Sequence, residues 1–543
     1  MKFEADLAVI GSGFGGSLTA LVARRLGLSV VLLERGEHPR FAIGESSSPL
    51  ANILLEALAD RYGLPRIRAL SKYGTWRRSH PDVACGLKRG FTFYAHPPGL
   101  PFAADPERTD QMLVAASPRD EIADTHWYRP DFDHFLVREA EKAGAVYLDR
   151  TALAKVTPRC EGTRIEGERK GSRVDVRARL VVDASGPRGF LFRGLGLGER
   201  PFESLPPTDG LYTHFSGVRR MDALLSGIGE TPPYPADDAA LHHVFPEGWI
   251  WVLRFENGIT SAGVAATERL SKELRFEEGD AAWRRLLDRL PTVHQQFEGA
   301  TALLPFVHHR RLSFRAERAA GPGWTLLPSA AAFVDPLLST GFPLTLLGIE
   351  RLGRALEEDW GKERLDARLA RDGDRTLFEA DTAALLIAAL YAAFDDFPLF
   401  AALSRLYFAA ASYSEAARRL GRPHLAGSFL CADREDFGPE LFGCCRAALS
   451  RPGAAAREAL LERLARAIEP LDVAGLSRAE RRNWFPVEAE DLLRGAGKLH
   501  ATPEEVRSML ARSGFLASPG DDRASKIDSP GVIQLHQTPG TGV

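Results

Sequence analysis

LAVIGSGFGGSLTALVARRLGLSVVLLE, residues 7–34, is the stretch of this sequence that decides the fold. The apolar run Leu7–Ile10 predicts a buried parallel strand, and Val30–Leu33 predicts a second strand that ends at Glu34. Between them, a G-x-G-x-x-G turn is followed by apolar residues at helical spacing. Together these elements predict a βαβ unit of the kind that binds a nucleotide.

The glycine turn and the terminal acid predict how this unit holds its ligand. The spaced glycines allow a tight turn, close approach of a pyrophosphate and contact between helix and strand. The helix N-terminus offers free N–H groups to the phosphates, and Glu34 stands where an acid accepts hydrogen bonds from the adenosine ribose. The candidate cofactor-binding residues of this unit are Gly11, Gly13, Phe14, Gly15, Gly16 and Glu34.

Composition narrows the classes of function. At 543 residues the chain is too long for one core, and its formal net charge of −3 gives no reason to expect a nucleic-acid partner. The five cysteines lack metal-ligand spacing, which predicts no metal site and a reducing, cytoplasmic location. The first strand begins too early to leave room for a signal peptide. The longest apolar run, 383–394, is too short to span a membrane and predicts a buried helix.

Three later segments favour FAD as the nucleotide. Residues 44–49 read GESSSP, a turn that could place hydroxyls and amides against a phosphate or ribityl chain. Residues 174–185 predict a strand that returns to the first sheet and ends in a small turn. Residues 333–341 lead into an apolar helix whose N-terminal amides could face an isoalloxazine edge or an anion. Strand-like segments within 210–305 predict an antiparallel sheet that faces the substrate.

In this order, the segments resemble the FAD-dependent monooxygenase fold. More closely they resemble the flavin-dependent halogenases and their halogenase-like relatives, over roughly residues 5–355. The resemblance is carried by GSGFGG at 11–16, GESSSP at 44–49, Lys88 in CGLKRGFTF, Trp249 and Trp251 in GWIWVLRF, and DPLLSTG at 335–341. It implies an α/β fold with a Rossmann-type FAD-binding domain, an inserted antiparallel β substrate domain and a helical C-terminal region.

The expected domain boundaries follow from that fold. The FAD-binding domain spans 1–355, mainly 1–95, 130–190 and 310–355, and the substrate sheet is interleaved with it at about 200–305. A helical region follows at 356–510. Residues 511–543, which include many Gly, Pro, Ser and Asp, predict a tail with little order.

By this resemblance, the protein is expected to use FADH2, O2 and a chloride or bromide to halogenate an electron-rich phenol, pyrrole or indole. In such halogenases, hypohalous acid formed beside the flavin crosses a short tunnel to a lysine that faces the substrate. Lys88 would be that catalytic lysine, and the backbone amides of Thr340 and Gly341 would hold the halide. The other cofactor-binding residues that the resemblance implies are Arg40, Gly44, Glu45, Ser46, Ser47, Arg129, Ser329, Asp335, Gly341 and Phe342.

The chain departs from the family pattern at three places. Leu253-Arg254 replaces the Ile-Pro of the W-x-W-x-I-P motif, which is thought to keep the organic substrate away from the flavin. Leu338 stands where tryptophan halogenases carry a glutamate, so a phenol or pyrrole is favoured over free tryptophan. Ser329 stands where an aspartate usually binds the ribityl chain.

These departures leave two alternatives open. One is an FAD-dependent monooxygenase that hydroxylates an aromatic ring, for example on a carrier- or peptide-bound substrate. The other is an accessory, non-catalytic flavoprotein. Because no second G-x-G-x-x-G motif is evident, electrons are expected from a separate flavin reductase.

Several polar and aromatic residues have plainer interpretations. Asp124, His126 and Asp133 suggest a metal site or a triad, but a capping or surface role is favoured for Asp133. His308–Arg311 predicts a solvated loop. The two tryptophans of GWIWVLRF alternate along one strand and face the same side, so they line either the site or the core alone.

Overall fold

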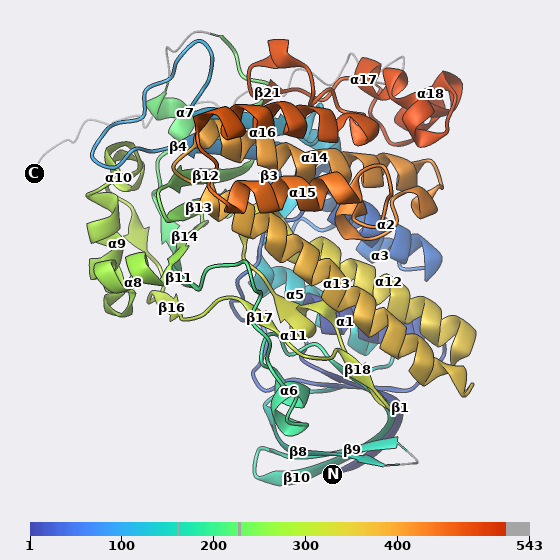
Figure 1. Ribbon diagram of the computed structural model, residues 1–543. Coiled ribbons are helices and arrows are strands. Elements are labelled where there is room, and N and C mark those ends of the chain that lie inside the picture. The colour runs from blue at the N-terminus through green and yellow to red at the C-terminus, as the bar shows by residue number, and fades with distance from the viewer. Residues whose placement is uncertain (160–161, 226–229, 517–543) are drawn as a thin grey trace, which may run out of the picture.

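The computed structural model describes residues 1–159, 162–225 and 230–516. Figure 1 shows a mostly parallel sheet beside the N-terminus, a second sheet above it and a large group of C-terminal helices. The predicted α/β fold with a helical C-terminal region is confirmed. Most of the predicted tail, from residue 517 on, lies outside the described residues.

The first sheet contains the predicted βαβ unit. Its strand order is β18-β19-β10-β1-β2-β7, and β1 pairs in parallel with both β2 and β10. These central strands are apolar because helices or loops cover both faces of the sheet. Strand β9 runs antiparallel to both β8 and β10. The elements are β1 (Lys2–Ile10), α1 (Phe14–Arg25), β2 (Val30–Leu33), α5 (Arg129–Lys142), β7 (Val146–Leu148), β8 (Thr151–Arg159), β9 (Gly162–Arg169), β10 (Ser172–Asp183), α6 (Phe190–Gly194), β18 (Ala320–Gly321) and β19 (Trp324–Leu326).

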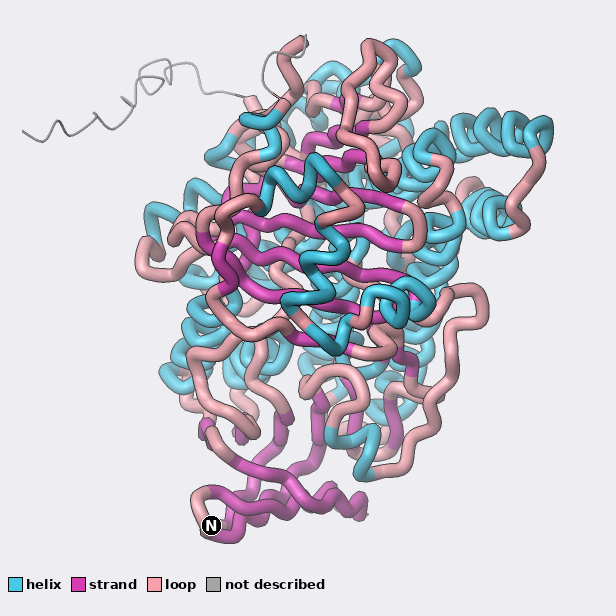
Figure 2. Tube along the Cα trace, turned by 90° about the vertical axis from the view of Figure 1, so that its left-hand side faces the viewer, coloured by secondary structure: helices cyan, strands magenta, loops and turns pink. Residues whose placement is uncertain are grey.

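The second sheet has the strand order β15-β11-β14-β13-β12-β4-β5-β21, with β16 beside β11. Helices α8–α10 cross the outer face of this sheet, which is turned toward the viewer in Figure 2. Along β13, Ile250 and Val252 pack toward these helices, whereas Trp249 and Trp251 face the interior. The elements are β4 (Gly90–Ala95), β5 (Gln111–Ala115), β11 (Thr208–Ser216), α7 (Met221–Leu224), β12 (Ala240–Phe245), β13 (Gly248–Arg254), β14 (Thr260–Thr267), α8 (Glu268–Leu274), α9 (Asp280–Leu287), α10 (Pro291–Phe297), β15 (Thr301–Ala302), β16 (Val307–His309) and β21 (Trp484–Phe485).

This second sheet differs from the antiparallel sheet expected within 200–305. The pairs β12–β4 and β5–β21 are parallel, and β4 belongs to this sheet although its residues fall in the segment 1–95 that we assigned to the FAD-binding domain. The physical reason is burial: Phe91 and Phe93 of β4 pack against Phe408 and Phe400 of the C-terminal helices. A strand buried in this way needs a paired neighbour on each side.

The C-terminal region is helical, as predicted. The apolar run 383–394 lies in the buried part of α13, and α13 packs on α12 and α15. Within the described residues, no helix has both the length and the hydropathy needed to cross a membrane. The helices are α12 (Gly341–Asp359), α13 (Arg364–Ala392), α14 (Phe397–Arg419), α15 (Gly438–Leu449), α16 (Ala454–Ala467), α17 (Ala489–Arg494) and α18 (Pro503–Arg512).

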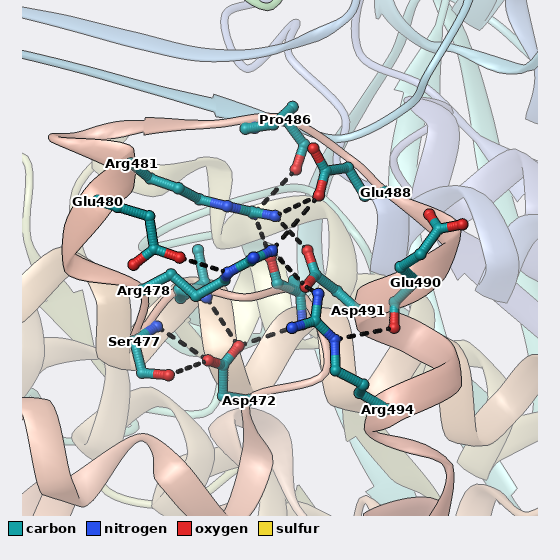
Figure 3. A network of polar contacts seen from close by, with 12 residues as sticks. Asp472, Ser477, Arg478, Glu480, Arg481, Pro486, Glu488, Glu490, Asp491 and Arg494 are labelled. Carbon is teal, nitrogen blue, oxygen red and sulfur yellow. Dashed lines mark hydrogen bonds and ion pairs between the residues drawn. The ribbon is translucent and has the colours of Figure 1, made fainter.

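The segment 472–494 is fixed by a network of ion pairs that Figure 3 shows. Arg481 is buried and donates to the carbonyl of Pro486 at 3.3 Å and to Glu488 at 2.8 Å. Asp491 accepts from Arg478 at 3.1 Å and pairs with Arg481 as well. This network orients the chain so that β21 pairs with β5 at the edge of the second sheet.

The remaining elements connect these parts. They are α2 (Pro49–Arg61), α3 (Pro65–Arg68), α4 (Tyr73–Ser79), β3 (Cys85–Lys88), β6 (Asp124–Trp127), β17 (Phe314–Arg315), α11 (Pro328–Ala331) and β20 (Ala332–Phe333). The strands β3 and β6 form a two-stranded antiparallel sheet of their own. Four of the cysteines are described, and all four are buried free thiols.

Candidate functional site

A cavity of about 690 Å³ lies at the carboxyl ends of β1, β2 and β10, where ligands bind in open α/β sheets. It brings together residues that are far apart in the sequence. The predicted residues that line it are Gly11, Gly13, Phe14, Gly15, Glu34, Arg40, Gly44, Glu45, Ser46, Arg129, Ser329, Asp335, Thr340, Gly341 and Phe342. Gly16, Ser47 and Lys88 do not line it.

The three spaced glycines have different roles in this cavity. A Cβ on Gly11 would lie 2.7 Å from the carbonyl oxygen of Ala184, and the φ of Gly11 is +93°. A Cβ on Gly16 would lie 1.9 Å from the carbonyl oxygen of Gly11, so Gly16 provides the contact between helix and strand. A Cβ on Gly13 would point into the cavity, with its nearest neighbour 3.5 Å away on Arg129. Only Gly13 therefore leaves room for a ligand.

Glu34 is buried at the end of β2 and is held as a carboxylate. It accepts hydrogen bonds from the backbone N–H of Ser12 at 3.0 Å and of Gly36 at 2.8 Å, and Arg40 lies 3.3 Å away. Burial opposes its charged form, but Arg40 and these hydrogen bonds outweigh burial and lower the pKa of Glu34. The side chain is thus ready to accept hydrogen bonds from ribose hydroxyls.

Arg129 and Asp133 form a buried ion pair at the cavity wall. Both oxygens of Asp133 accept from Arg129, at 2.8 and 2.7 Å, and Asp133 is fully buried. The surface or capping role expected for Asp133 is therefore wrong, because the side chain turns inward to neutralise Arg129. Arg129 also donates to the carbonyl of Gly44 at 2.8 Å and so fixes the GESSSP loop.

The GESSSP loop has one side toward the cavity and one side toward β6. Glu45 is buried, accepts from His214 at 2.8 Å, and its Oε2 has no hydrogen-bond partner among the described residues. Ser46 lines the cavity. Ser47, which we expected to bind the cofactor, instead turns away and donates to the carbonyl of Thr125 at 2.7 Å. Adjacent residues of an extended loop face opposite sides, and the sequence alone does not show which of the two faces the cavity.

The DPLLSTG segment forms the turn before α12. Asp335 accepts from Trp249, Tyr391 and the backbone of Leu337, and burial raises its pKa to about 6. Asp335 thus orders the turn, and both of its oxygens already accept hydrogen bonds from the protein. Leu338 is buried in the core with φ +63°. A Cβ on Gly341 would meet no atom within 4 Å, and Thr340 and Gly341 both line the cavity, so the N-terminus of α12 adjoins it.

The tryptophan strand forms an apolar wall of the same cavity. Trp249, Trp251 and Leu253 all line it, and the two indole rings lie 5.6 Å apart. Arg254, which replaces proline in the family motif, points away and donates to Asp237 at 2.9 Å. The wall therefore remains apolar without the Ile-Pro pair. His308–Arg311 is mostly exposed, but the expected solvated loop is only partly confirmed, because His308 and His309 belong to β16 and His309 lines the cavity.

Lys88 is fully buried just behind this cavity. Its Nζ donates to Ser46 Oγ at 2.9 Å and to the carbonyl of Ser47. It also lies 3.7 Å from the ring centre of Phe91. Burial lowers the pKa of Lys88, and the nearby carboxylate of Asp124 opposes that shift.

A second, smaller cavity of about 110 Å³ lies on the other side of Phe91. Its walls include Phe91 from β4, Tyr407 and Phe408 from α14, and Leu510 from α18. Pro49, directly after the GESSS turn, also lines it. Lys88 thus contacts one wall residue of each cavity: Ser46 of the larger and Phe91 of the smaller.

Several residues of this arrangement were not predicted from the sequence. Asp124 was considered only for a metal site or a triad, His214 and Tyr407 carry no motif, and the walls supplied by α14 and α18 come from a region without a recognisable pattern.

The larger cavity fits FAD by the chemistry of its donors. It offers a carboxylate at the end of β2, a side-chain-free glycine turn at a helix N-terminus, and a second helix N-terminus at Gly341. Beside this cavity, the buried Oε2 of Glu45 has no hydrogen-bond partner among the described residues. Its volume falls within the range of ligand pockets.

Comparison with known proteins agrees with this geometry. The sequence pattern of the family described as FAD dependent oxidoreductase matches residues 6–334. The chain is 29% identical over 422 residues to the monodechloroaminopyrrolnitrin halogenase PrnC of Pseudomonas fluorescens, covering 74% of this chain and 70% of that protein. It is 32% identical over 368 residues to the tetracycline 7-halogenase of Kitasatospora aureofaciens, covering 65% of this chain and 64% of that protein, which is just under two thirds.

Among solved structures, the chain is similar to the halogenase PltM in complex with phloroglucinol and FAD. The TM-score is 0.80 at 26% identity, and the match covers 88% of this chain and 99% of the other. The flavin-dependent brominase Bmp2 shares the fold with a TM-score of 0.60 at 22% identity, covering 82% of this chain and 99% of that one.

Proposed function

We propose, from the premise that this chain belongs to the FAD dependent oxidoreductase family, that it is a flavin-dependent halogenase acting on a single electron-rich aromatic ring. Its relatives include flavin-dependent halogenases. The observation that carries the proposal is the place of Lys88. A buried amine lies between a nucleotide-sized cavity and a small aromatic cavity, bonded to a wall residue of the first and stacked on a wall residue of the second.

The larger cavity would hold FAD through Glu34 at the ribose and Gly13 with the α1 N-terminus at the pyrophosphate. Arg129, Ser46 and Ser329 would contact the rest of the cofactor. When bound in reduced form, FAD supplies, with O2, the oxidation of a halide to hypohalous acid. The first amides of α12, at Thr340 and Gly341, would hold chloride or bromide there, because a helix N-terminus binds anions. A separate flavin reductase would supply the FADH2.

Lys88 would receive the oxidised halogen and aim it at the substrate. Its Nζ has three donors, and its charge or lone pair can hold hypohalous acid in one orientation. The apolar wall of Trp249, Trp251 and Leu253 would keep an organic ring away from the flavin. Since Leu253 preserves that wall, the structure supports halogenation over direct hydroxylation of the ring.

The smaller cavity would hold the substrate. Its volume of about 110 Å³ is near that of an engineered cavity of about 150 Å³ that binds benzene, so it suits one ring. Phe91, Tyr407 and Phe408 offer ring faces and edges for stacking. PltM was crystallised with phloroglucinol, a one-ring compound, whereas two relatives act on pyrrole groups carried by a peptidyl-carrier protein. The cavity size favours a free one-ring phenol over a carrier-bound substrate.

The test uses the full chain with reduced FAD, O2, bromide and a panel of phenols, pyrroles and indoles. Mass spectrometry separates brominated from hydroxylated products. We expect brominated phenols from the parent and at least a hundredfold less from Lys88→Met, because the amine positions the halogen. Lys88→Met preserves the length of the side chain, and its FAD binding reports whether it folds.

Lys142→Met is the matched control, since Lys142 is an exposed lysine of α5. Its yield should equal that of the parent. Equal bromination by Lys88→Met would remove the role given to Lys88. Oxygen insertion without any effect of bromide in the parent would replace the halogenase by the monooxygenase, and no product from any substrate would favour the accessory flavoprotein.

A further inference from the structure

We propose that Asp124 is a positioning residue that favours the ammonium form of Lys88 and thereby sets how it holds the halogen. The inference rests on the proposed function of Lys88, but the charge of Lys88 can be measured without any turnover. It concerns a side chain that the sequence pattern did not connect with Lys88.

The pairing of two short strands places Asp124 opposite Lys88. In the antiparallel sheet β3–β6, Lys88 and Asp124 are register partners. Lys88 is 0% exposed and Asp124 is 6% exposed, so water solvates neither charge well. An uncompensated charge in such a place is costly, and a buried lysine loses its proton unless a partner stabilises it.

The hydrogen-bond partners of Lys88 do not neutralise it. Its Nζ donates to the hydroxyl of Ser46 and the carbonyl of Ser47 and lies over the ring of Phe91, all of which are uncharged. Asp124 uses Oδ1 to accept from Asn52 at 2.7 Å. Its Oδ2 is buried and accepts no hydrogen bond among the described residues. Asp124 is the only acid paired across this sheet. Among the described residues it forms no ion pair with Lys88 within 4 Å, so it acts on Lys88 through the field of its charge.

The other titratable groups near the pair do not supply that charge. His126 of β6 and His242 of β12 stay neutral, because burial lowers the pKa of each to about 3. Glu415 and Arg419 of α14 act on the pKa of Asp124 in opposite directions; they pair with each other at 2.8 Å, and Arg419 also lies 3.8 Å from Glu56. From α2, only the neutral amide of Asn52 reaches Asp124. Burial raises the pKa of Asp124 to about 7 and the charge of Lys88 opposes that rise, so the two groups stabilise each other's charged forms.

The charge decides which chemistry Lys88 can perform. An ammonium donates hydrogen bonds to the oxygen of hypohalous acid and polarises it, with no covalent bond to nitrogen. A neutral amine would instead attack the halogen, forming an N–halogen bond as the halogen–oxygen bond breaks, and the hydroxide released takes the proton from nitrogen as water. By raising the proton affinity of Lys88, Asp124 favours the first mode over the second at a given pH.

The experiment labels the ten lysines of the full chain with ¹³C at Cε and follows their shifts with pH. The signal that Lys88→Met lacks is that of Lys88. We expect Asp124→Asn to move its titration midpoint down by about one pH unit or more, the effect of losing an opposite charge nearby. Asp124→Glu should restore most of the shift, and the pH profile of bromination should move in parallel.

Asp209→Asn is the matched control, because Asp209 is a buried acid on β11 that is paired with Ser271 and His308 rather than with a lysine. It should leave the Lys88 midpoint unchanged. If Asp124→Asn does not fold, Asn52→Ala provides a second variant. It removes the hydrogen bond that stabilises the carboxylate, so the Lys88 midpoint should fall by a smaller amount.

A Lys88 midpoint that is the same in the parent, Asp124→Asn and Asn52→Ala would overturn the proposal. This outcome is distinct from failure of the proposed function, because the titration needs neither halide nor substrate. A shifted midpoint in a protein that makes only hydroxylated product would uphold the charge pairing while removing the halogenase.

Discussion

Replacing Gly13 and Gly16 separately by Ala should separate cofactor binding from folding. At Gly16 the new Cβ would lie 1.9 Å from the carbonyl oxygen of Gly11, so the backbone of α1 must move away from β1. At Gly13 the nearest atoms to the new Cβ are on Arg129 at 3.5 Å and Asp133 at 3.7 Å. The backbone of Gly13, with φ −64° and ψ 178°, suits any residue.

These distances give different magnitudes. Overpacking at Gly16 should lower the free energy of unfolding by about 3 kcal/mol or more. Gly13→Ala should change the free energy of unfolding by less than about 1 kcal/mol, because its methyl points into the cavity. In the holoprotein that methyl occupies the path of the pyrophosphate and removes a charge-assisted hydrogen bond worth about 1.5–3 kcal/mol. FAD binding should therefore weaken about tenfold to a hundredfold.

Urea unfolding of the cofactor-free protein measures stability, and quenching of flavin fluorescence measures FAD affinity. Gly453→Ala is the matched control, since Gly453 caps α16 with φ −65° and ψ 167° and has no atom near its Cβ position. It carries the same helix-capping penalty without facing the cavity. Parental FAD affinity in Gly13→Ala, or parental stability in Gly16→Ala, would refute the assignment of these roles.

Three other variants or conditions test the same site. Glu34→Ala should weaken FAD binding by about 1–3 kcal/mol, since the carboxylate accepts from the ribose; unchanged affinity by calorimetry would show that the ribose lies elsewhere. Asp133→Ala leaves the Arg129 charge buried and unpaired, so it should lower the free energy of unfolding by about 3–5 kcal/mol, and Arg129→Met in the same chain should restore part of it, as urea unfolding would show. Burial lowers the pKa of His242 to about 3 and of His243 to about 4, below the usual 6.5, so the unfolded chain binds protons first as the pH falls. Stability should be full above pH 6.5 and fall below it by about 1 kcal/mol per histidine per pH unit, and His242→Asn should flatten this dependence of the urea midpoint; a midpoint that is equal at pH 7.5 and pH 5.5 would contradict it.

The nucleotide-binding unit could be predicted from the sequence because its contacts are local. Strand, glycine turn, helix and strand follow each other within residues 7–34, and Gly16 is required by a backbone contact with Gly11 inside that stretch. The resemblance to halogenases also identified Lys88 and the turn before α12. These are motifs in which a short run of sequence fixes both the backbone and the chemistry.

Tertiary structure alone decided what each side chain faces. Ser46 and Ser47 are adjacent, yet one lines the cavity and the other bonds to Thr125. Asp133 was expected at the surface but neutralises Arg129 in the interior. No local pattern distinguishes these outcomes, because burial depends on which distant segment covers the residue.

By itself, the sequence determined a βαβ unit, an FAD-type site and a candidate lysine, since hydrophobic period and glycine spacing act over a few residues. Only the folded chain brought Asp124 opposite Lys88 and placed Phe91 between that lysine and a cavity walled by α14 and α18. Those contacts join residues that are tens to hundreds of positions apart. They form because apolar surfaces from three parts of the chain must be buried together. The free energy of that burial depends on all three parts at once, so it cannot be predicted from any one of them.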